Sequence, residues 1–248
     1  MKTSSPAALP DACPENLRVN RPGGLALTRK ALGICKFNGM DPILDAGCGW
    51  GATPRFLRED KGLFALGLDA DPNRLDQGMA YGRFPAAAAR LEALPFGREQ
   101  FQGIFCECVL SLVPDKQACL HGFFTILKPG GSLVLTDLIL PRVLPRVPPR
   151  EAVTPRPAAP VTCLDGALTL DALAAAIENA GFRIRVMEDH TRLLKEMACE
   201  MVFRHGSLDR FWAQLTGNIM DTGLAGQCRR GVLKPGYCMV IADKPQLP

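Results

Sequence analysis

The sequence predicts an α/β fold built on a doubly wound, Rossmann-like sheet, mostly parallel with an antiparallel last strand and with helices on both faces. From residue 42 onward, short apolar runs alternate with segments whose apolar residues have helical spacing. The runs are apolar throughout rather than at alternate positions, which is typical of parallel strands buried on both faces. The chain of 248 residues, 47% of them hydrophobic, is long enough for one such domain with a sizeable core.

The elements of the first half follow one another as strand and helix. Expected strands are 42–47, 64–70, a weak one near 84–91, 101–109 and 131–139, and expected helices are 24–33, 52–60, 72–82 and 115–127. Ahead of them, residues 1–16 are rich in Pro, Ala and Ser and are expected to form a loose tail. We therefore assign residues 1–39 to an N-terminal tail and helix, and residues 40–248 to the domain.

The second half interrupts this alternation and then resumes it. Residues 141–160 hold seven prolines, which exclude helix and sheet interiors, so we expect an insertion that is either a lid or a solvated linker. The elements expected after it are a helix over 169–180 with Thr169 as N-cap, a strand over 182–189, a helical insertion over 191–227 and a last strand over 236–244.

Composition argues against several classes of function. A formal charge of +4 without a dense run of Lys or Arg argues against nucleic acid as a partner. No apolar stretch is long enough to cross a bilayer and the N-terminus lacks an apolar signal segment, so we expect a cytoplasmic protein with no membrane partner. The ten cysteines are scattered without the spacing of a zinc site, so we expect no metal site.

The stretch DAGCGWG, residues 45–51, carries the strongest chemical signal. Gly47, Gly49 and Gly51 follow a strand and open a helix, where the backbone can approach a nucleotide-like ligand closely. The glycines alone allow a dinucleotide or an adenosyl cofactor. Asp45 favours the second, because a carboxylate suits the cationic S-adenosylmethionine (SAM) better than an anionic pyrophosphate. Asp69 ends the next strand and can accept both hydroxyls of a ribose in either ligand.

Five motifs in order resemble those of class I SAM-dependent methyltransferases. DAGCGWG is followed by GLDADP (67–72), EALPF (92–96), FQGIFCECVLSLVPD (101–115) and LKPGGSLVLTDL (127–138). The resemblance runs from about residue 40 to the C-terminus, and it implies S-adenosyl-L-methionine as the cofactor. The cofactor-binding residues that it implies are Asp45, Gly47, Cys48, Gly49, Gly51, Asp69, Ala70, Leu91, Glu92 and Cys106.

Two positions depart from the pattern of that family. Arg90 stands where the family often has an aspartate that bonds the adenine amine, and Gln102 replaces the usual acid of the fourth strand. Both changes weaken single contacts, although Leu91 can still offer its backbone groups. They motivate a second hypothesis, a non-catalytic accessory protein that binds SAM. A nicotinamide-dependent enzyme is a third hypothesis, which Asp45 disfavours.

The methyl acceptor is expected to be a small molecule. The segments ECVLSLVPDK, LKPGGSLVLTDL and CLDGALT resemble arsenite methyltransferases, which hold a trivalent metalloid with soft thiolate ligands. Cys163 matches one cysteine of that branch, and Cys228 lies roughly where another is found. Pro54 stands where the branch has a third, and Cys106 or Cys108 could supply the missing thiolate. A thiol- or metalloid-type acceptor such as arsenite is therefore one option.

Three residues are candidates for direct roles in methyl transfer: Glu107, Cys163 and His190. Transfer from a sulfonium mainly needs a positioned nucleophile and excluded water, with a base only where the nucleophile must lose a proton. Glu107, at the end of the fourth strand, could bind a cationic or hydroxyl substrate. His190 could act as the base, since histidine is the side chain that commonly exchanges protons near neutral pH, or could simply cap a helix. The acceptor and the oligomeric state stay open.

Overall fold

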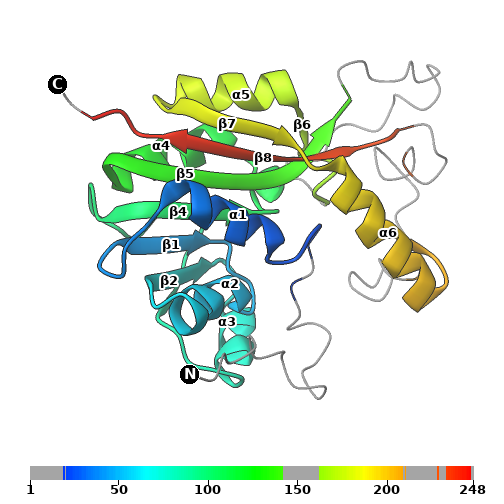
Figure 1. Ribbon diagram of the computed structural model, residues 1–248, viewed down its shortest axis with the longest axis horizontal. Helices are drawn as coiled ribbons and strands as arrows, with labels where there is room; N and C mark the ends of the chain where they lie inside the picture. The colour runs from blue at the N-terminus through cyan, green and yellow to red at the C-terminus, as the bar shows by residue number, and fades with distance from the viewer. Residues whose placement is uncertain are drawn as a thin grey trace.

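One mixed sheet organises the molecule. The computed structural model describes residues 19, 21–141, 162–208, 210, 228 and 233–246. Its strands are β1 Pro42–Ala46, β2 Phe64–Asp69, β3 Ala86–Ala88, β4 Phe101–Glu107, β5 Leu127–Leu140, β6 Leu168–Thr169, β7 Arg183–Asp189 and β8 Gly236–Asp243. In the part of the chain described, they follow the order β3-β2-β1-β4-β5-β8-β7, with the short β6 beside β5 (Figure 1).

The strand directions confirm the predicted fold class. β1 pairs in parallel with β2 and β4, and β5 continues the parallel arrangement beyond β4. β8, the last strand, lies antiparallel between β5 and β7. The order of the parallel strands reverses between β1 and β4, since the chain first builds outward to β3 and then returns. Ligands of open α/β sheets bind beyond the carboxyl ends of the strands at such a reversal.

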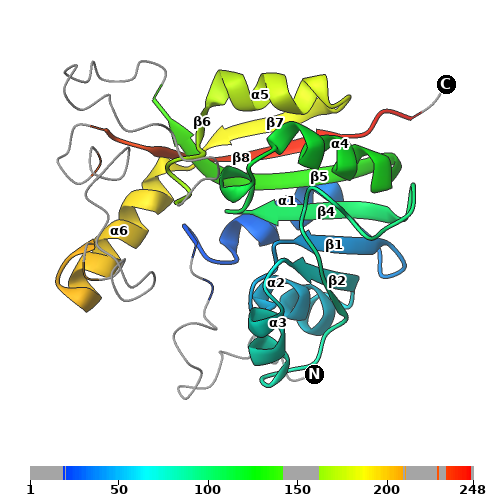
Figure 2. The ribbon, with the colours of Figure 1, turned by 180° about the vertical axis from the view of Figure 1, so that it is seen from behind.

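Helices cover both faces of the sheet, as predicted. They are α1 Ala26–Cys35, α2 Ala52–Arg55 with the π-helical turn η2 Phe56–Asp60, α3 Pro72–Met79, the 3₁₀ turn η3 Leu110–Leu112, α4 Lys116–Ile126, α5 Leu170–Asn179 and α6 Thr191–His205. α1, η2 and α6 pack their apolar residues on one face, and α4 and α5 pack on the other (Figure 2). Burial of these apolar faces is the main favourable term that holds the helices to the sheet.

Local sequence explains where the helices begin. The hydroxyl of Thr169, the predicted N-cap, accepts a hydrogen bond from the backbone N–H of Ala172 at 3.3 Å. Asp71 caps α3 ahead of Pro72, and Asp115 caps α4. Each cap satisfies a backbone N–H that the first helical turn leaves without a partner.

Some of the structure was not predicted. β5 begins at Leu127, several residues before the expected strand, and β6 adds two residues of parallel pairing to its far end. The proline-rich stretch 141–160 lies outside the described residues except for Pro141. α6 forms the first part of the predicted helical insertion 191–227, and most of the remainder also lies outside them.

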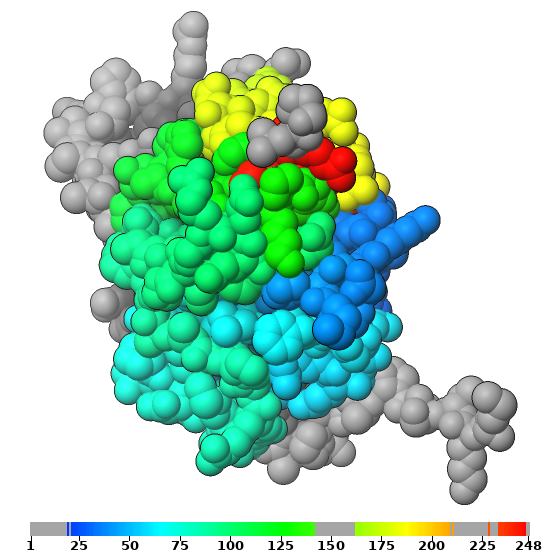
Figure 3. Space-filling model, turned by 90° about the vertical axis from the view of Figure 1, so that its left-hand side faces the viewer, coloured from blue at the N-terminus to red at the C-terminus, as the bar shows by residue number. Residues whose placement is uncertain are grey.

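The carboxyl ends and the amino ends of the parallel strands lie on opposite sides of the molecule. The carboxyl ends of β1, β2 and β4 bring Asp45, Asp69 and Glu107 to one edge. At the opposite edge, the segments that lead into the parallel strands lie side by side (Figure 3). Among the described helices, none is long and apolar enough to cross a membrane.

Candidate functional site

The turn after β1 requires its glycines. Gly47, Gly49 and Gly51 have φ angles of +85°, +55° and +80°, a region that side chains with a Cβ rarely adopt. A Cβ at Gly47 would lie 2.4 Å from Val109, and one at Gly51 would lie 2.0 Å from the Phe84 ring. The turn therefore folds tightly over the sheet only with glycine at these positions.

Asp69 joins the end of β2 to this turn. Its carboxylate accepts a hydrogen bond from the Gly49 backbone N–H at 2.8 Å and another from that of Asp71 at 2.9 Å. Each carboxylate oxygen keeps a second lone pair, so the group can still accept hydrogen bonds from a ligand. The contact fixes the predicted ribose acceptor against the glycine turn.

Asp45 lies beneath the turn and is only 3% exposed. Burial raises the pKa of its carboxyl well above the usual range, the neighbouring Glu107 and Asp69 raise it further, and Arg21 opposes them. A buried acid of this kind is stabilised in its charged form by a cation that enters the site. Its predicted role as an electrostatic partner for a cationic ligand stays a prediction.

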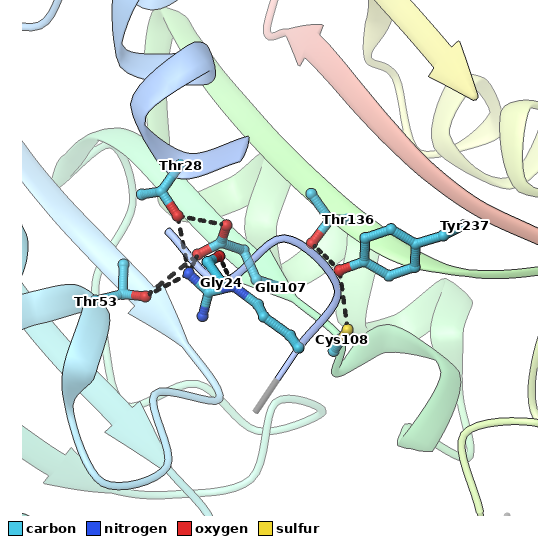
Figure 4. A network of polar contacts seen from close by, with 8 residues as sticks. Gly24, Thr28, Thr53, Glu107, Cys108, Thr136 and Tyr237 are labelled. Atoms are coloured by element: carbon cyan, nitrogen blue, oxygen red, sulfur yellow. Dashed lines mark hydrogen bonds and ion pairs between the residues drawn. The ribbon is translucent and has the colours of Figure 1, made fainter. Parts of the chain in front are cut away.

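Glu107 takes part in a buried polar network at the end of β4 (Figure 4). Its carboxylate forms an ion pair of 2.7 Å with the guanidinium of Arg21 and accepts hydrogen bonds from the hydroxyls of Thr28 and Thr53 at 2.8 and 3.3 Å. Arg21 also donates to both threonines. The network ties the segment before α1 and the start of α2 to the sheet.

Cys108 follows Glu107 in a strained backbone conformation, with a φ of +59°. Its thiol lies 3.0 Å from the hydroxyl of Tyr237, which donates a hydrogen bond to Thr136 at 2.9 Å (Figure 4). Burial raises the pKa of the Cys108 thiol well above its usual range, and Asp137 raises it further. The thiol is therefore held in its protonated form.

A cavity of about 380 Å³ opens beyond the carboxyl ends of β1, β2 and β4. Of the residues predicted to touch cofactor or substrate, those that line it are Gly47, Cys48, Gly49, Asp69, Ala70, Leu91, Glu92 and Glu107. Asp45 and Gly51 do not line the cavity. Cys106 is fully buried in the hydrophobic core, so its side chain packs there rather than facing the cavity.

Comparison with known proteins agrees with this geometry. Residues 44–135 match a family described as "Methyltransferase domain". The structure resembles Haemonchus contortus phosphoethanolamine N-methyltransferase 2 in complex with S-adenosyl-L-methionine, with a TM-score of 0.68, 19% identity and coverage of 91% of this chain and 54% of that one. The matched residues thus form a methyltransferase domain, and the fold around them is that of class I SAM-dependent methyltransferases.

Two curated relatives of the methyltransferase domain share more of its sequence. The uncharacterized methyltransferase YodH of Bacillus subtilis is 36% identical over 132 residues, which are 50% of this chain and 54% of that protein. The arsenite methyltransferase of Halobacterium salinarum is 26% identical over 150 residues, or 57% of this chain and 37% of that protein. The chain thus spans about half or less of the length of these curated relatives.

Arg90 and Gln102, the two residues that depart from the methyltransferase pattern, form contacts with other parts of this chain. Arg90 lines the cavity and forms an exposed ion pair of 3.0 Å with Glu92. The amide of Gln102 donates to the backbone carbonyl of Gly130 at 3.3 Å, so it secures the start of β5. Neither side chain blocks the cavity.

The cysteines predicted to bind a metalloid lie in different surroundings. Cys163 is half-buried, and burial together with Asp137 raises the pKa of its thiol to about 12. It lies near enough to Cys108 to raise the pKa of that thiol as well. Cys228 packs beside the small apolar cluster of Leu140, Ala167 and Leu233, and Pro54 is buried in α2.

His190 lies apart from the cofactor cavity, at the end of β7 and directly before α6. Its Nε2 is 2.8 Å from the carboxylate of Glu188, which also forms an ion pair with Lys30 of α1. The backbone N–H of His190 donates to the carbonyl of Tyr237. These contacts join α1, β7 and β8, and its assignment as a base stays a prediction.

A second cavity, of about 440 Å³, lies at the far end of β5, where α5 and α6 begin. Its charged lining residues are Asp171, Asp189, Lys195 and Lys234. Among the described residues, no group of three or more His, Cys, Asp or Glu side chains is arranged to hold a metal ion.

Sequence reasoning missed Arg21, Thr28 and Tyr237 as residues of the site. Arg21 lies between the segments read as a tail and as a helix, and no motif covers it. Tyr237 was read only as part of the last strand. No local pattern signals their contacts, because Arg21 meets Glu107 and Tyr237 meets Cys108 only through pairing between distant parts of the chain.

Proposed function

We propose that the protein transfers a methyl group from SAM to a small-molecule acceptor bound beside the cavity. The observation that carries this proposal is the hydrogen bond from the Gly49 backbone to Asp69 at the mouth of a cavity with several acidic residues. A glycine turn joined to a ribose acceptor suits an adenosyl group. The acids Asp45, Asp69 and Glu107 suit a cofactor that carries a sulfonium and an ammonium.

Residues of this chain would hold the cofactor in defined ways. Asp69 would accept the ribose hydroxyls, the backbone around Gly49 would allow close approach, and Leu91 and Glu92 would border the adenine. When bound, SAM supplies an electrophilic methyl group on a sulfonium. The protein's own task is then to orient the acceptor and to exclude water.

Glu107 has a more specific proposed role. Both of its oxygens already accept hydrogen bonds, from Arg21, Thr28 and Thr53. We therefore propose that it acts by its charge and by fixing Arg21, rather than by taking a proton from the acceptor. Cys163 and His190 stay candidates for contact with the acceptor.

A screen with SAM labelled in its methyl group tests the proposed activity. Amines, phenols, thiols and arsenite are offered to the protein, and labelled product is counted. Product with any of them supports a methyltransferase. If SAM binds but no acceptor is methylated, the non-catalytic accessory protein becomes the better hypothesis.

A metalloid is the second candidate acceptor, favoured by the proximity of Cys108 and Cys163 at the carboxyl edge of the sheet. Thiols are suitable ligands for a soft trivalent centre, and one relative is an arsenite methyltransferase. A signal with arsenite that is lost in both Cys163→Ser and Cys108→Ser supports this candidate. No arsenite signal under reducing conditions excludes it.

A further inference from the structure

Arg21 reaches the cofactor cavity from outside every recognised motif. It lies in the segment before α1 and lines the cavity together with Val19. Its side chain is only 12% exposed, although arginine is seldom so deeply buried without a strong partner. That partner is Glu107, whose side chain is 1% exposed.

The contacts of Arg21 occupy only part of its guanidinium. Its Nη2 donates to Thr28 and Thr53 at 2.8 and 3.0 Å and forms the ion pair with Glu107, while Nε donates to the Gly24 carbonyl at 3.1 Å. Among the described residues, none forms a hydrogen bond or ion pair with Nη1. Two N–H donors of a fixed, permanently charged group are therefore left for a ligand.

The position of Arg21 determines which part of the ligand it would meet. Asp69 ends β2 and Glu107 ends β4, and β1 with its glycine turn lies between these strands. A ligand whose ribose contacts Asp69 and which crosses the turn brings its other end to Glu107 and Arg21. In SAM, that end is the amino-acid part, which carries a carboxylate.

The other arginines of the cavity lie at its opposite end. Arg74 forms an ion pair with Asp71 and stacks over the Trp50 ring. Arg90 forms its ion pair with Glu92. At the end formed by Glu107, Arg21 is the cation that lines the cavity among the described residues.

We propose that Arg21 binds the carboxylate of the amino-acid part of SAM through Nη1, and that Glu107 holds the guanidinium in position for it. The inference rests on the proposed function, because it assumes SAM in this cavity. A charge-assisted hydrogen bond between guanidinium and carboxylate is among the stronger polar contacts in proteins. It also explains why the end of the cavity formed by Glu107 includes an arginine.

Decarboxylated SAM provides a direct test, since it lacks only the carboxylate. Dissociation constants of SAM and decarboxylated SAM are measured by calorimetry for wild type, Arg21→Met and Arg90→Met. We expect wild type to bind SAM about tenfold or more tightly than the decarboxylated analogue. Arg21→Met should lose this preference or reverse it, because the remaining acids favour the more cationic analogue. Arg90→Met removes the same charge at the other end and should keep the preference.

Several outcomes overturn the inference. If wild type binds both compounds equally, or prefers the analogue, Arg21 does not bind the carboxylate, and this result requires no variant to fold. If the preference persists in folded Arg21→Met, another group recognises the carboxylate. If the folded wild type binds neither SAM nor the analogue, the proposed function itself is wrong. This failure is therefore distinguishable from a failure of the inference about Arg21.

Discussion

Asp45 illustrates how burial and neighbouring acids change the ionisation of a single residue. Its carboxyl is buried between Glu107 and Asp69, and these surroundings disfavour its charged form. An acid whose pKa is raised by folding favours the folded state when it is protonated. Its contribution to stability is therefore fully present at pH values below the pKa of the unfolded state. That stabilisation is lost as the pH rises through the folded pKa. At neutral pH we therefore expect the residue to lower stability and to favour the binding of a cation.

Asp45→Asn should separate these two effects. We expect the variant to be more stable than wild type at pH 7 in urea denaturation, because a carboxyl whose ionisation is disfavoured by folding is removed. Its affinity for SAM should fall by about tenfold, because an ionic partner is lost. A variant that is less stable and binds SAM as wild type does would contradict the assignment.

Asp69 should matter for binding in a way that its neighbour Asp71 does not. Asp69→Ala removes the proposed ribose acceptor and the partner of the Gly49 N–H, so we expect SAM affinity to fall by about tenfold to a hundredfold. Asp71→Ala removes the N-cap of α3 and should cost about 1 kcal/mol of stability. Calorimetry should find its SAM affinity close to that of wild type. Equal losses of affinity in both variants would refute the ribose assignment.

At the scale of elements, the glycine turn combines two separate requirements. In Gly51→Ala the alanine would have to adopt a φ of +80°, and its Cβ would clash with the Phe84 ring. In Gly62→Ala the alanine would have to adopt a φ of +64°, but its Cβ would have no neighbour within 4 Å. We expect a loss of about 1 kcal/mol for Gly62→Ala and about 3 kcal/mol or more for Gly51→Ala, measured by urea denaturation. Similar losses in the two variants would show that the turn is not tightly packed.

Asp137 anchors η3 to the end of β5. It accepts hydrogen bonds from the Ser111 backbone and hydroxyl at 2.7 and 2.6 Å, and from the Leu138 N–H at 2.7 Å. Burial raises the pKa of Asp137 from 3.8 to about 6, although these hydrogen bonds oppose the shift. Its contribution to stability is therefore greatest below the unfolded pKa and falls as the pH rises to the folded value.

Asp137→Ala should reveal this pH dependence. The difference in unfolding free energy between wild type and Asp137→Ala should shrink by about 2 kcal/mol between pH 4 and pH 6. Urea denaturation at several pH values measures it. Ser111→Ala, which removes one hydrogen bond and no acid, should show little of this change. A difference that grows with pH would contradict the assignment.

For the whole molecule, the sequence predicts the sheet better than it predicts the site. Continuous apolar runs reveal parallel strands because both faces are buried, so β1, β2, β4 and β5 could be located. β6 could not, since its two residues, Leu168 and Thr169, overlap a helix start and pair only through the tertiary fold. Local patterns record the burial of a segment but not its distant partners.

Some residues of the site could likewise be predicted from the sequence, and others could not. Gly47 and Gly49 could be predicted because the turn requires them within one short stretch, and Asp69 because it ends the next strand. The ion pair between Arg21 and Glu107 could not, because it joins the segment before α1 to the end of β4. Cys106 and Cys108 were equivalent by strand spacing. The structure separates them, since Cys106 is in the core and Cys108 lines the cavity.

SAM binding in this cavity is tested most directly by one calorimetric comparison. Wild-type protein, shown to be folded, is titrated with SAM and, in a matched run, with NADH. We expect SAM to bind with one-to-one stoichiometry and NADH to produce no binding heat, because the acids around Asp45 favour a cationic ligand over a pyrophosphate. Folded protein that binds NADH, or that fails to bind SAM, would contradict the proposed function.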